Sequence, residues 1–177
     1  MTDLKYTANF CEENIWHLCQ HPELSDFDKQ VVFISSLSRN TPLQYQKSAQ
    51  NGLPVWWDYH VILMTSKNSK HLIYDFDTTL PFPSKASEYL SKTFQDVTGM
   101  KSQDYPLFKI IRATEYVEQF HSDRLHMIDQ SGNWIFEPPQ WPAIKSGGSL
   151  SLSTLMDFSD ASSTPIFELN DLMAKMS

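Results

Sequence analysis

The first clear hydrophobic pattern in the chain begins at Cys11 and has the period of a helix. Ile15, Leu18 and Cys19 follow Cys11 at offsets of four, seven and eight residues, so all four share one helical face. The two glutamates directly after Cys11 are typical of a first turn, where acids complement the helix dipole. Pro22 ends the pattern. We therefore predict a helix that starts at Cys11 and carries the Cys11 thiol at its N-terminus.

Four further segments are rich in apolar, β-branched and aromatic residues, which predicts strands. They are residues 31–35, 55–65, 71–76 and 107–113. The short polar segment 66–70 separates the second strand from the third, so we expect these two to form a hairpin. The polar stretch 38–51 predicts a long loop.

The second half of the chain predicts two more helices and a second loop. Thr114 is a suitable N-cap for a helix that runs through Tyr116, Val117 and Phe120. Three prolines within residues 132–142 predict a loop, and residues 167–175 predict a final helix. Because a hairpin forces antiparallel pairing, the expected fold class is α/β of the α+β kind, with a largely antiparallel sheet flanked by helices.

Length and charge narrow the classes of function. The chain has 177 residues, which suits one domain over residues 1–177. The formal net charge of −7 disfavours nucleic acid and anionic membranes as partners. No run of about 18 apolar residues is present to span a bilayer. The N-terminal residues lack the basic and apolar regions of a secretory signal.

The two cysteines, Cys11 and Cys19, are expected to be free thiols. Eight residues along one helix correspond to a rise of about 12 Å, too far for a disulfide. Free thiols are typical of a reducing compartment, so we expect a cytoplasmic protein that also enters the nucleus. Nothing in the sequence demands more than a monomer.

The predicted hairpin brings two residues with catalytic potential together. A turn centred between Lys67 and Asn68 places His60 opposite Asp75. Directly opposed residues in an antiparallel pair lie about 4.5–5.5 Å apart on the same face, so an imidazole N–H can reach the carboxylate. A register slip of one residue would separate them.

A carboxylate that holds a histidine in one tautomer needs only a nucleophile to complete a triad. Cys11 is suited to that role, because backbone N–H groups at a helix N-terminus favour a thiolate and can stabilise an oxyanion. The next two glutamates oppose ionisation of the thiol, so the histidine is needed as well. The order Cys, His, Asp along the chain is the arrangement of papain-like and transglutaminase-like folds, an analogy at the level of fold.

Several longer motifs accompany these residues in fixed order. They are Cys-Glu-Glu-Asn-Ile-Trp at 11–16, Trp-Asp-Tyr-His-Val at 57–61, Ile-Tyr-Asp-Phe-Asp-Thr at 73–78, Leu-Pro-Phe-Pro at 80–83, Ser-Asp-Arg at 122–124 with His126-Met127, Ser-Gly-Asn-Trp at 131–134 and Glu-Pro-Pro at 137–139. Together they resemble the protein N-terminal glutamine amidohydrolase family, from about Cys11 to Pro142. The short leader before Cys11 and the tail after Pro142 match least.

The resemblance implies a reaction and a set of residues. The family hydrolyses the side-chain amide of an N-terminal Gln in proteins to give N-terminal Glu and ammonia, without a cofactor. It does not act on internal Gln, on free Gln or on N-terminal Asn. In eukaryotes this step feeds an arginine-transfer and ubiquitin-dependent degradation route, the N-degron pathway. The catalytic Cys, His and Asp of the family fall on Cys11, His60 and Asp75.

Selection of an N-terminal residue requires a partner for the α-ammonium group of the substrate. A carboxylate is the natural choice, because a charge-assisted hydrogen bond contributes about 1.5–3 kcal/mol. Glu12, Asp58 and Asp77 lie near the predicted triad in sequence, and Asp123 is a more distant candidate. The sequence does not rank them.

Two other functions are compatible with the same residues. A transglutaminase or peptidase uses an identical triad and differs only in what resolves the thioester. A non-catalytic module that binds peptide N-termini is the third alternative, although a binder has no need of all three residues. We expect no metal: His17 and His21 are four residues apart, but Glu13 precedes them instead of lying between them as in His-Glu-x-x-His.

Overall fold

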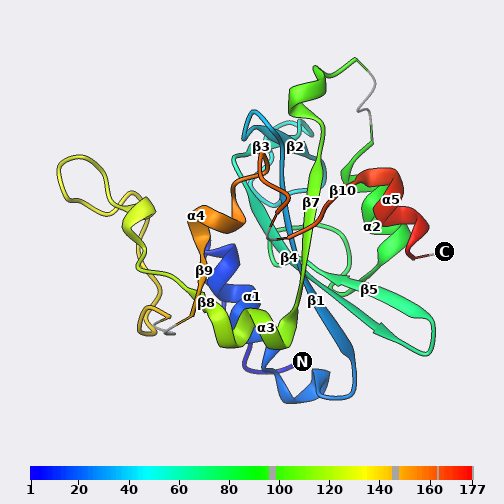
Figure 1. Ribbon diagram of the computed structural model, residues 1–177, viewed down its shortest axis with the longest axis horizontal. Coiled ribbons are helices and arrows are strands. Elements are labelled where there is room, and N and C mark those ends of the chain that lie inside the picture. Colours follow the sequence, from blue (N-terminus) through cyan, green and yellow to red (C-terminus); the bar gives the residue numbers. More distant parts are fainter. Residues whose placement is uncertain (96–98, 145–147, 163, 177) are drawn as a thin grey trace.

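A computed structural model describes residues 1–95, 99–144, 148–162 and 164–176 of the protein. Six strands form one antiparallel sheet, and Figure 1 shows it running through the centre of the molecule. From one edge to the other, the strands are β10 (Ile166–Glu168), β7 (Leu107–Arg112), β1 (Asp28–Ser35), β4 (His60–Lys67), β5 (Lys70–Tyr74) and β6 (Ser84–Lys85). With helices on its two sides the sheet makes an α+β fold, which confirms the expected class.

Helices cover both faces of this sheet. They are α1 (Cys11–Cys19), α2 (Ala86–Thr93), α3 (Ala113–Gln119), α4 (Leu152–Leu155) and α5 (Leu169–Ala174). In Figure 1, α1, α3 and α4 lie on one side of the sheet, and α2 and α5 lie on the other. Along the chain, the helices therefore cross from one side to the other at α2, return at α3 and α4, and cross again at α5.

The side chains of the central strands separate into two apolar cores. In β1, Val31 and Phe33 pack with α1 and α3, whereas Val32 and Ile34 pack with α2. β4 follows the same alternation, because successive side chains of a strand point to opposite faces. Burial on both faces explains why these strands are almost continuously apolar in sequence. Cys19 lies in the first core, with 3% of its surface exposed, as its helical position predicts.

The predicted strand over 55–65 is two strands in the structure. Residues Val55–Trp57 form β3, which pairs with β2 (Thr41–Leu43) in a separate two-stranded sheet. β2 lies within the stretch 38–51 that we expected to be a loop. The long sheet resumes only with β4, so His60 is the first residue of a central strand.

Asp58 accounts for the break between the two strands. Its side-chain Oδ1 accepts a hydrogen bond from the N–H of Tyr59 at 2.9 Å, and its backbone carbonyl accepts one from the Ser35 hydroxyl. These contacts satisfy backbone groups that a continuous ladder would otherwise pair. Propensity alone does not reveal such a local alternative to the sheet.

The hairpin forms, but its register differs from the predicted one. Its turn consists of Asn68 and Ser69, both with positive φ, and Lys67 pairs with Lys70. Leu63 therefore faces Tyr74, a shift of two residues from the expected register. A shift of two keeps every side chain on its face and leaves His60 diagonal to Asp75. The two side chains still meet.

Two helix boundaries also differ from those expected. α3 begins at Ala113 after Arg112, without a side-chain cap, so Thr114 is not the N-cap. The helix ends at Gln119, and Phe120 belongs to β8 (Phe120–His121), which pairs in parallel with β9 (Leu150–Ser151). The predicted last helix over 167–175 begins as strand β10 and becomes helical only at α5.

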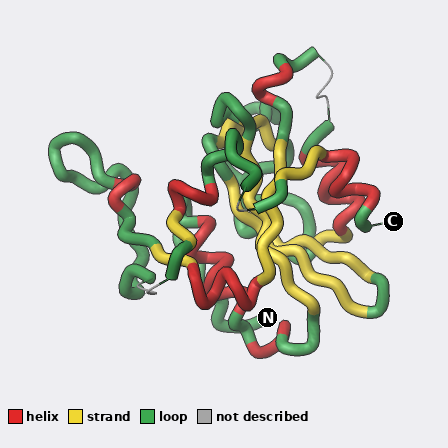
Figure 2. Tube along the Cα trace, viewed as in Figure 1, coloured by secondary structure: helices red, strands yellow, loops and turns green. Residues whose placement is uncertain are grey.

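An arm of mostly irregular structure connects β8 to β9. Figure 2 shows it extending away from the sheet, with one short helical turn, η3 (Leu125–Met127). An isolated bridge between Ile128 and Trp134 closes its outer loop. The expected loop over 132–142 lies in this arm. Among the described residues, no helix has the length and apolar character needed to cross a membrane.

The base of this arm is tightly packed where Gly148 lies against Gln119, next to the β8–β9 pair. A Cβ atom added to Gly148 would lie 2.2 Å from the carbonyl oxygen of Gln119 and 2.4 Å from its Cα. Since both are backbone atoms, Gly148→Ala must displace the strand pair, and we expect a loss of about 1–3 kcal/mol in the free energy of unfolding. Urea denaturation measures it.

Ser149→Ala is the matched control, because the Ser149 side chain is exposed and only its backbone N–H bonds Gln119. Its effect should stay within about 0.5 kcal/mol. Equal stabilities for the two variants would mean that the close packing at Gly148 is wrong.

Candidate active site

Cys11 opens α1 at the wall of a cavity. Phe10 is the N-cap residue and supplies no side-chain hydrogen bond, so the first-turn N–H groups are not capped by it. The cavity has a volume of about 380 Å³. Its lining residues come from the start of α1, the segments around β2 and β3, the arm and the end of α4: Asn9, Cys11, Arg39, Trp57, Asp58, Tyr59, His126, Met127, Ile135, Phe136 and Met156.

His60 and Asp75 form a buried hydrogen-bonded pair. The Nε2 atom of His60 lies 2.8 Å from Oδ1 of Asp75, and both side chains have 1% exposure or less. The backbone N–H of Asp77 donates to the same carboxylate oxygen at 2.9 Å. The other oxygen, Oδ2, accepts from the Tyr89 hydroxyl at 2.8 Å. The side-chain amide of Gln46 also donates to Oδ2 at 3.4 Å, so four donors hold the carboxylate.

These contacts shift the two pKa values in opposite directions. Burial raises the pKa of Asp75, but the charge and hydrogen bond of His60 outweigh burial and hold that pKa below its usual value. Burial lowers the pKa of His60, and the charge and hydrogen bond of Asp75 reverse this effect, so the pKa lies above its usual value. Asp75 therefore makes His60 a stronger base.

The second ring nitrogen of His60 is left for another partner. Its Nδ1 atom is fully buried and has no hydrogen-bond partner among the described residues. The Trp57 ring stacks on the imidazole with a centroid separation of 5.2 Å and an interplanar angle of 25°. Asp75 on one edge and Trp57 on one face thus fix the orientation of the ring. Nδ1 is the atom that can exchange a proton with a neighbouring group.

The Cys11 thiol is protonated in its resting environment. Burial, followed by the charge of Glu12, raises the pKa of Cys11 well above its usual value. The backbone N–H of Val61, the residue after His60, acts in the opposite direction. This contact places the sulfur beside the start of β4. The helix N-terminus does not by itself produce a thiolate here.

Glu12 is buried directly behind the thiol. Its Oε2 accepts a hydrogen bond from the Tyr59 hydroxyl at 3.0 Å and lies 3.8 Å from Sγ of Cys11. Its Oε1 has no hydrogen-bond partner in the described chain, and Nε2 of His126 is 3.7 Å away. Burial raises the pKa of Glu12 to about 7. One oxygen of this carboxyl group is therefore free for a donor from outside the chain.

Glu13, unlike Glu12, is fully paired, and it holds the arm to α1. It forms a bidentate ion pair with Arg124, with both N–O distances at 2.7 Å. The indole N–H of Trp141 donates to Glu13 at 2.7 Å, and Arg124 donates to the carbonyl of Trp141 at 2.9 Å. Glu13 and Arg124 are both buried, so the pair is well shielded from solvent. It fixes the arm residues that wall the cavity.

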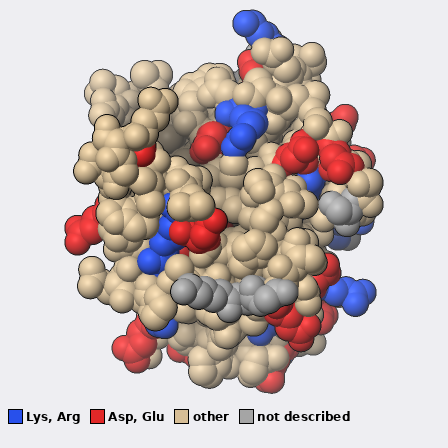
Figure 3. Space-filling view, turned by 60° about the vertical axis from the view of Figure 1, so that its left-hand side comes forward, with Lys and Arg blue, Asp and Glu red and all other residues tan. Residues whose placement is uncertain are grey.

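The other acidic candidates differ in position. Asp58 is exposed and lines the cavity that holds Cys11. Asp77 is buried and accepts a hydrogen bond from the Tyr6 hydroxyl at 2.6 Å. Asp123 lines a neighbouring cavity instead. Figure 3 shows this side of the molecule as a hollowed face with acidic and basic side chains in small separate groups.

One group of residues has the spacing of a metal site. Ligand atoms of His60, Asp75 and Asp77 all lie within 4.8 Å of one another. Protein donors already occupy this group, since Asp75 accepts from His60 and Asp77, and Tyr6 donates to Asp77. A metal ion would have to displace these bonds. The donor set therefore fits a hydrogen-bond network better than a metal centre.

Several contributors to this site gave little or no signal in the sequence. Tyr89 on α2 and Gln46, whose amide lies 3.4 Å from Asp75, stand outside the quoted motifs. Trp57 and Tyr59 belong to the motif around His60, but their contacts depend on the break before β4. Arg124 belongs to a quoted motif without an assigned partner. Only the fold brings it to Glu13.

The raised pKa of Glu12 gives a measurable pH dependence of stability. Its pKa of about 7 in the folded protein exceeds the ordinary glutamate value of 4.5, so the folded protein holds this proton more tightly than the unfolded chain. The stabilising contribution is complete below about pH 4.5 and is lost as the pH rises through about 7. A glutamine at this position cannot ionise. As the pH rises from 5 to 8, the free energy of unfolding of Glu12→Gln should therefore increase by roughly 2–3 kcal/mol relative to that of the parent protein.

Urea denaturation at both pH values checks this expectation. Glu118→Gln is the control, because Glu118 is exposed and should show no such gain. A parent protein and a Glu12→Gln variant with the same pH dependence of stability would contradict the burial of an ionisable Glu12.

Comparisons of the sequence with known proteins identify a family and its relatives. A model of the N-terminal glutamine amidase family matches residues 6–176. The protein N-terminal glutamine amidohydrolase of Homo sapiens is 40% identical over 149 residues, which cover 81% of this chain and 73% of the human protein. The Bos taurus protein of the same name is 40% identical over 149 residues, covering 81% and 72%. That of Danio rerio is 39% identical over 148 residues, covering 80% and 72%. The resemblance found in the motifs is thereby confirmed, and the chain belongs to the N-terminal glutamine amidase family.

Proposed function

We propose that the protein hydrolyses the side-chain amide of an N-terminal Gln in peptides and proteins, giving N-terminal Glu and ammonia. Cys11 is the nucleophile, His60 the general base and acid, and Asp75 the residue that orients His60. The observation that carries this proposal is the buried His60–Asp75 hydrogen bond. It leaves Nδ1 of His60 without a hydrogen-bond partner among the described residues, while the Cys11 sulfur contacts the adjacent residue Val61. The names of the relatives in Homo sapiens and Bos taurus support the choice of substrate.

The first half of the reaction forms a thioester. His60 takes the thiol proton on Nδ1 as Sγ of Cys11 attacks the side-chain amide carbon of Gln. The bond from this carbon to its nitrogen then breaks, and the imidazolium returns the proton to the leaving nitrogen, which departs as ammonia. Asp75 favours this step because it stabilises the imidazolium and keeps the Nε2–H directed at itself.

The second half uses the same base. Water attacks the γ-glutamyl thioester while His60 takes one of its protons. The carbon–sulfur bond breaks, the proton passes to the sulfur, and N-terminal Glu leaves. In both halves the oxyanion can be stabilised by first-turn N–H groups of α1, since Phe10 supplies no side-chain cap.

Glu12 is the proposed receptor for the substrate α-ammonium group. It is adjacent to the nucleophile, and its Oε1 has no hydrogen-bond partner among the described residues. Only the short Gln side chain separates the ammonium from the reacting carbon, so the receptor must lie close to Sγ. Asp58 is the second choice because it is exposed, and Asp77 already binds Tyr6. This arrangement accounts for selection of the N-terminal residue.

Both cysteines are free thiols. A nucleophilic Cys11 must stay reduced, so we place the protein in the cytoplasm and nucleus, where the proposed reaction feeds the N-degron pathway. One chain contains all the residues that the mechanism uses, and we propose that it acts as a monomer.

The central test is ammonia release from a peptide that begins with Gln. Cys11→Ser and Asp75→Asn should each lower kcat/KM by at least about 10³-fold, because each removes one member of a unit that acts together. Circular dichroism checks that the variants are folded. Cys19→Ser is the matched control, since Cys19 is buried in the core away from the cavity, and it should keep its activity.

Matched peptides with internal Gln or leading Asn should release no ammonia. If internal Gln reacted equally well, the proposal that the protein selects N-terminal Gln would be wrong. Transfer of a labelled primary amine to the substrate, in place of water, would favour a transglutaminase. Full activity in Cys11→Ser would assign the nucleophile to another residue.

The role of Glu12 has a separate test. Since its carboxylate must be ionised to bind an ammonium, kcat/KM should fall as the pH drops through about 7. Glu12→Gln should raise KM for Gln peptides about tenfold or more, which corresponds to loss of one charge-assisted hydrogen bond. An N-acetylated Gln peptide lacks the ammonium, so its KM should differ little between the parent protein and the Glu12→Gln variant. A Glu12→Gln variant with an unchanged KM would exclude Glu12 as the receptor.

A further inference from the structure

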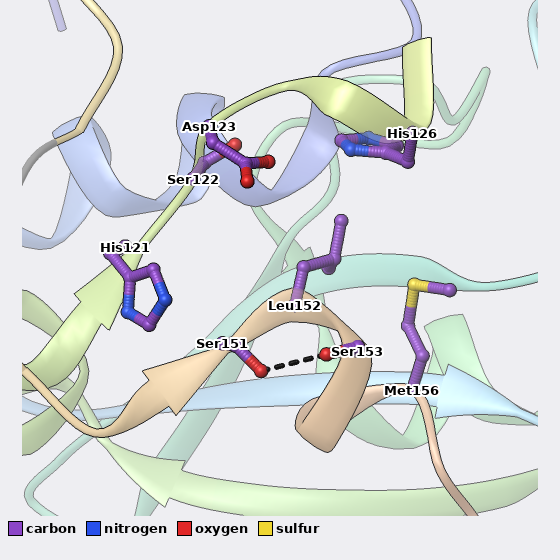
Figure 4. A pocket seen from close by; sticks show the side chains of 8 residues that line it. All are labelled: His121, Ser122, Asp123, His126, Ser151, Leu152, Ser153 and Met156. Carbon is purple, nitrogen blue, oxygen red and sulfur yellow. Dashed lines mark hydrogen bonds between the residues drawn. The ribbon is translucent and has the colours of Figure 1, made fainter. Parts of the chain in front are cut away.

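A second cavity lies directly beside the one that holds Cys11. It has a volume of about 260 Å³. His126 and Met156 line both cavities, so these two side chains form the wall between them. Figure 4 shows the residues that line it: His121, Ser122, Asp123, His126, Ser151, Leu152, Ser153 and Met156. None of them takes part in the reaction proposed above.

The cavity is built where the arm leaves the body of the protein. His121 in β8 pairs with Ser151 in β9, and the N–H of Ser122 donates to the carbonyl of Ile144 at 3.0 Å. In Figure 4, Asp123 and His126 lie on one side of the cavity and Leu152 faces them from the start of α4. Secondary structure thus holds the walls on both sides.

The polar groups of this cavity favour a cation. Asp123 is the one carboxylate in the lining, and no Lys or Arg lines the cavity in the described part of the chain. The N–H of Leu125 donates to Oδ1 of Asp123 at 3.0 Å, which fixes the carboxylate. Burial lowers the pKa of His126, which disfavours a positive charge on this imidazole.

Two polar atoms in the lining have no hydrogen-bond partner among the described residues. They are Oγ of Ser122, whose residue is only 4% exposed, and Nδ1 of His121. A buried polar atom without a partner costs free energy unless a ligand or water supplies one. They belong to the two residues directly before Asp123. Their position is independent evidence that the cavity accepts a polar ligand.

We infer that this cavity is the subsite for the side chain of the residue that follows the N-terminal Gln, and that it prefers Lys or Arg. The inference rests on the proposed function. When Gln occupies the cavity with Cys11, the next residue lies beside the shared wall, and successive side chains of an extended peptide point in opposite directions. Asp123 then pairs with a basic side chain, and the apolar surfaces of Leu152 and Met156 pack against its methylene groups.

The experiment compares kcat/KM for three peptides that differ only at the second position: Gln-Lys-Gly-Gly-amide, Gln-Gly-Gly-Gly-amide and Gln-Glu-Gly-Gly-amide. The parent protein should favour Lys over Glu by about two- to fivefold, as expected for one partly exposed ion pair. The preference should shrink at high salt. Asp123→Asn should abolish it, and Asp123→Lys should reverse it in favour of Glu.

The readout is the ratio of the two rates in each protein, so a uniform change in activity does not affect the result. Asp26→Asn is the matched control: it removes one exposed carboxylate that lines neither cavity, and its ratio should equal that of the parent. Equal rates for Lys and Glu in the parent, with the Gly peptide converted, would overturn the subsite alone. No ammonia from any of the three peptides would overturn the proposed function and the subsite with it.

Discussion

The burial of four carboxyl groups around the start of α1 is the constraint on which the rest of the structure depends. Glu12, Glu13, Asp75 and Asp77 have between 0 and 8% of their surfaces exposed. An ionised carboxylate removed from water costs several kcal/mol unless it is paired and hydrogen-bonded. Each group has such a partner from another part of the chain: Tyr59 for Glu12, Arg124 and Trp141 for Glu13, His60 and Tyr89 for Asp75, and Tyr6 for Asp77. The N-terminal segment, the sheet, α2 and the arm are all fixed to one place by these contacts.

The same burial gives neighbouring carboxyl groups different protonation. Asp75 accepts donors on both oxygens and faces His60, so its pKa is held low. Glu12 has one hydroxyl donor and, in the described part of the chain, one oxygen without a hydrogen-bond partner, so burial dominates and its pKa reaches about 7. Divergent values for nearby acids are typical of catalytic sites, where one group must stay charged and another must respond to a ligand. In the proposed reaction Asp75 orients His60 in every step, and Glu12 changes its protonation state when the substrate binds.

The sequence predicted those features that depend on local pattern. The helix at Cys11, the central strands and the meeting of His60 with Asp75 follow from periodicity and from one hairpin. The strand over 55–65 and the register of the hairpin were wrong, because Asp58 bonds locally and the turn falls at Asn68 and Ser69. Tyr89 and Gln46 could not have been found, since their contacts with Asp75 depend on how α2 and the segment after β2 pack. The predicted opposition of Glu12 to ionisation of the thiol agrees with the raised pKa of Cys11, to which burial contributes more than the charge of Glu12.

A protonated thiol beside a buried glutamate is a poor nucleophile in the absence of substrate. The negative charge of Glu12 is, after burial, the largest cause of the raised pKa of Cys11, and Oε2 of Glu12 lies 3.8 Å from the sulfur. If Glu12 receives the substrate ammonium, the paired charge no longer opposes ionisation of the thiol. The group that selects an N-terminal residue then also removes an obstacle to attack on it. A protein-internal Gln brings no ammonium and leaves the thiol protonated, so in the proposed mechanism selectivity and activation come from the same carboxylate.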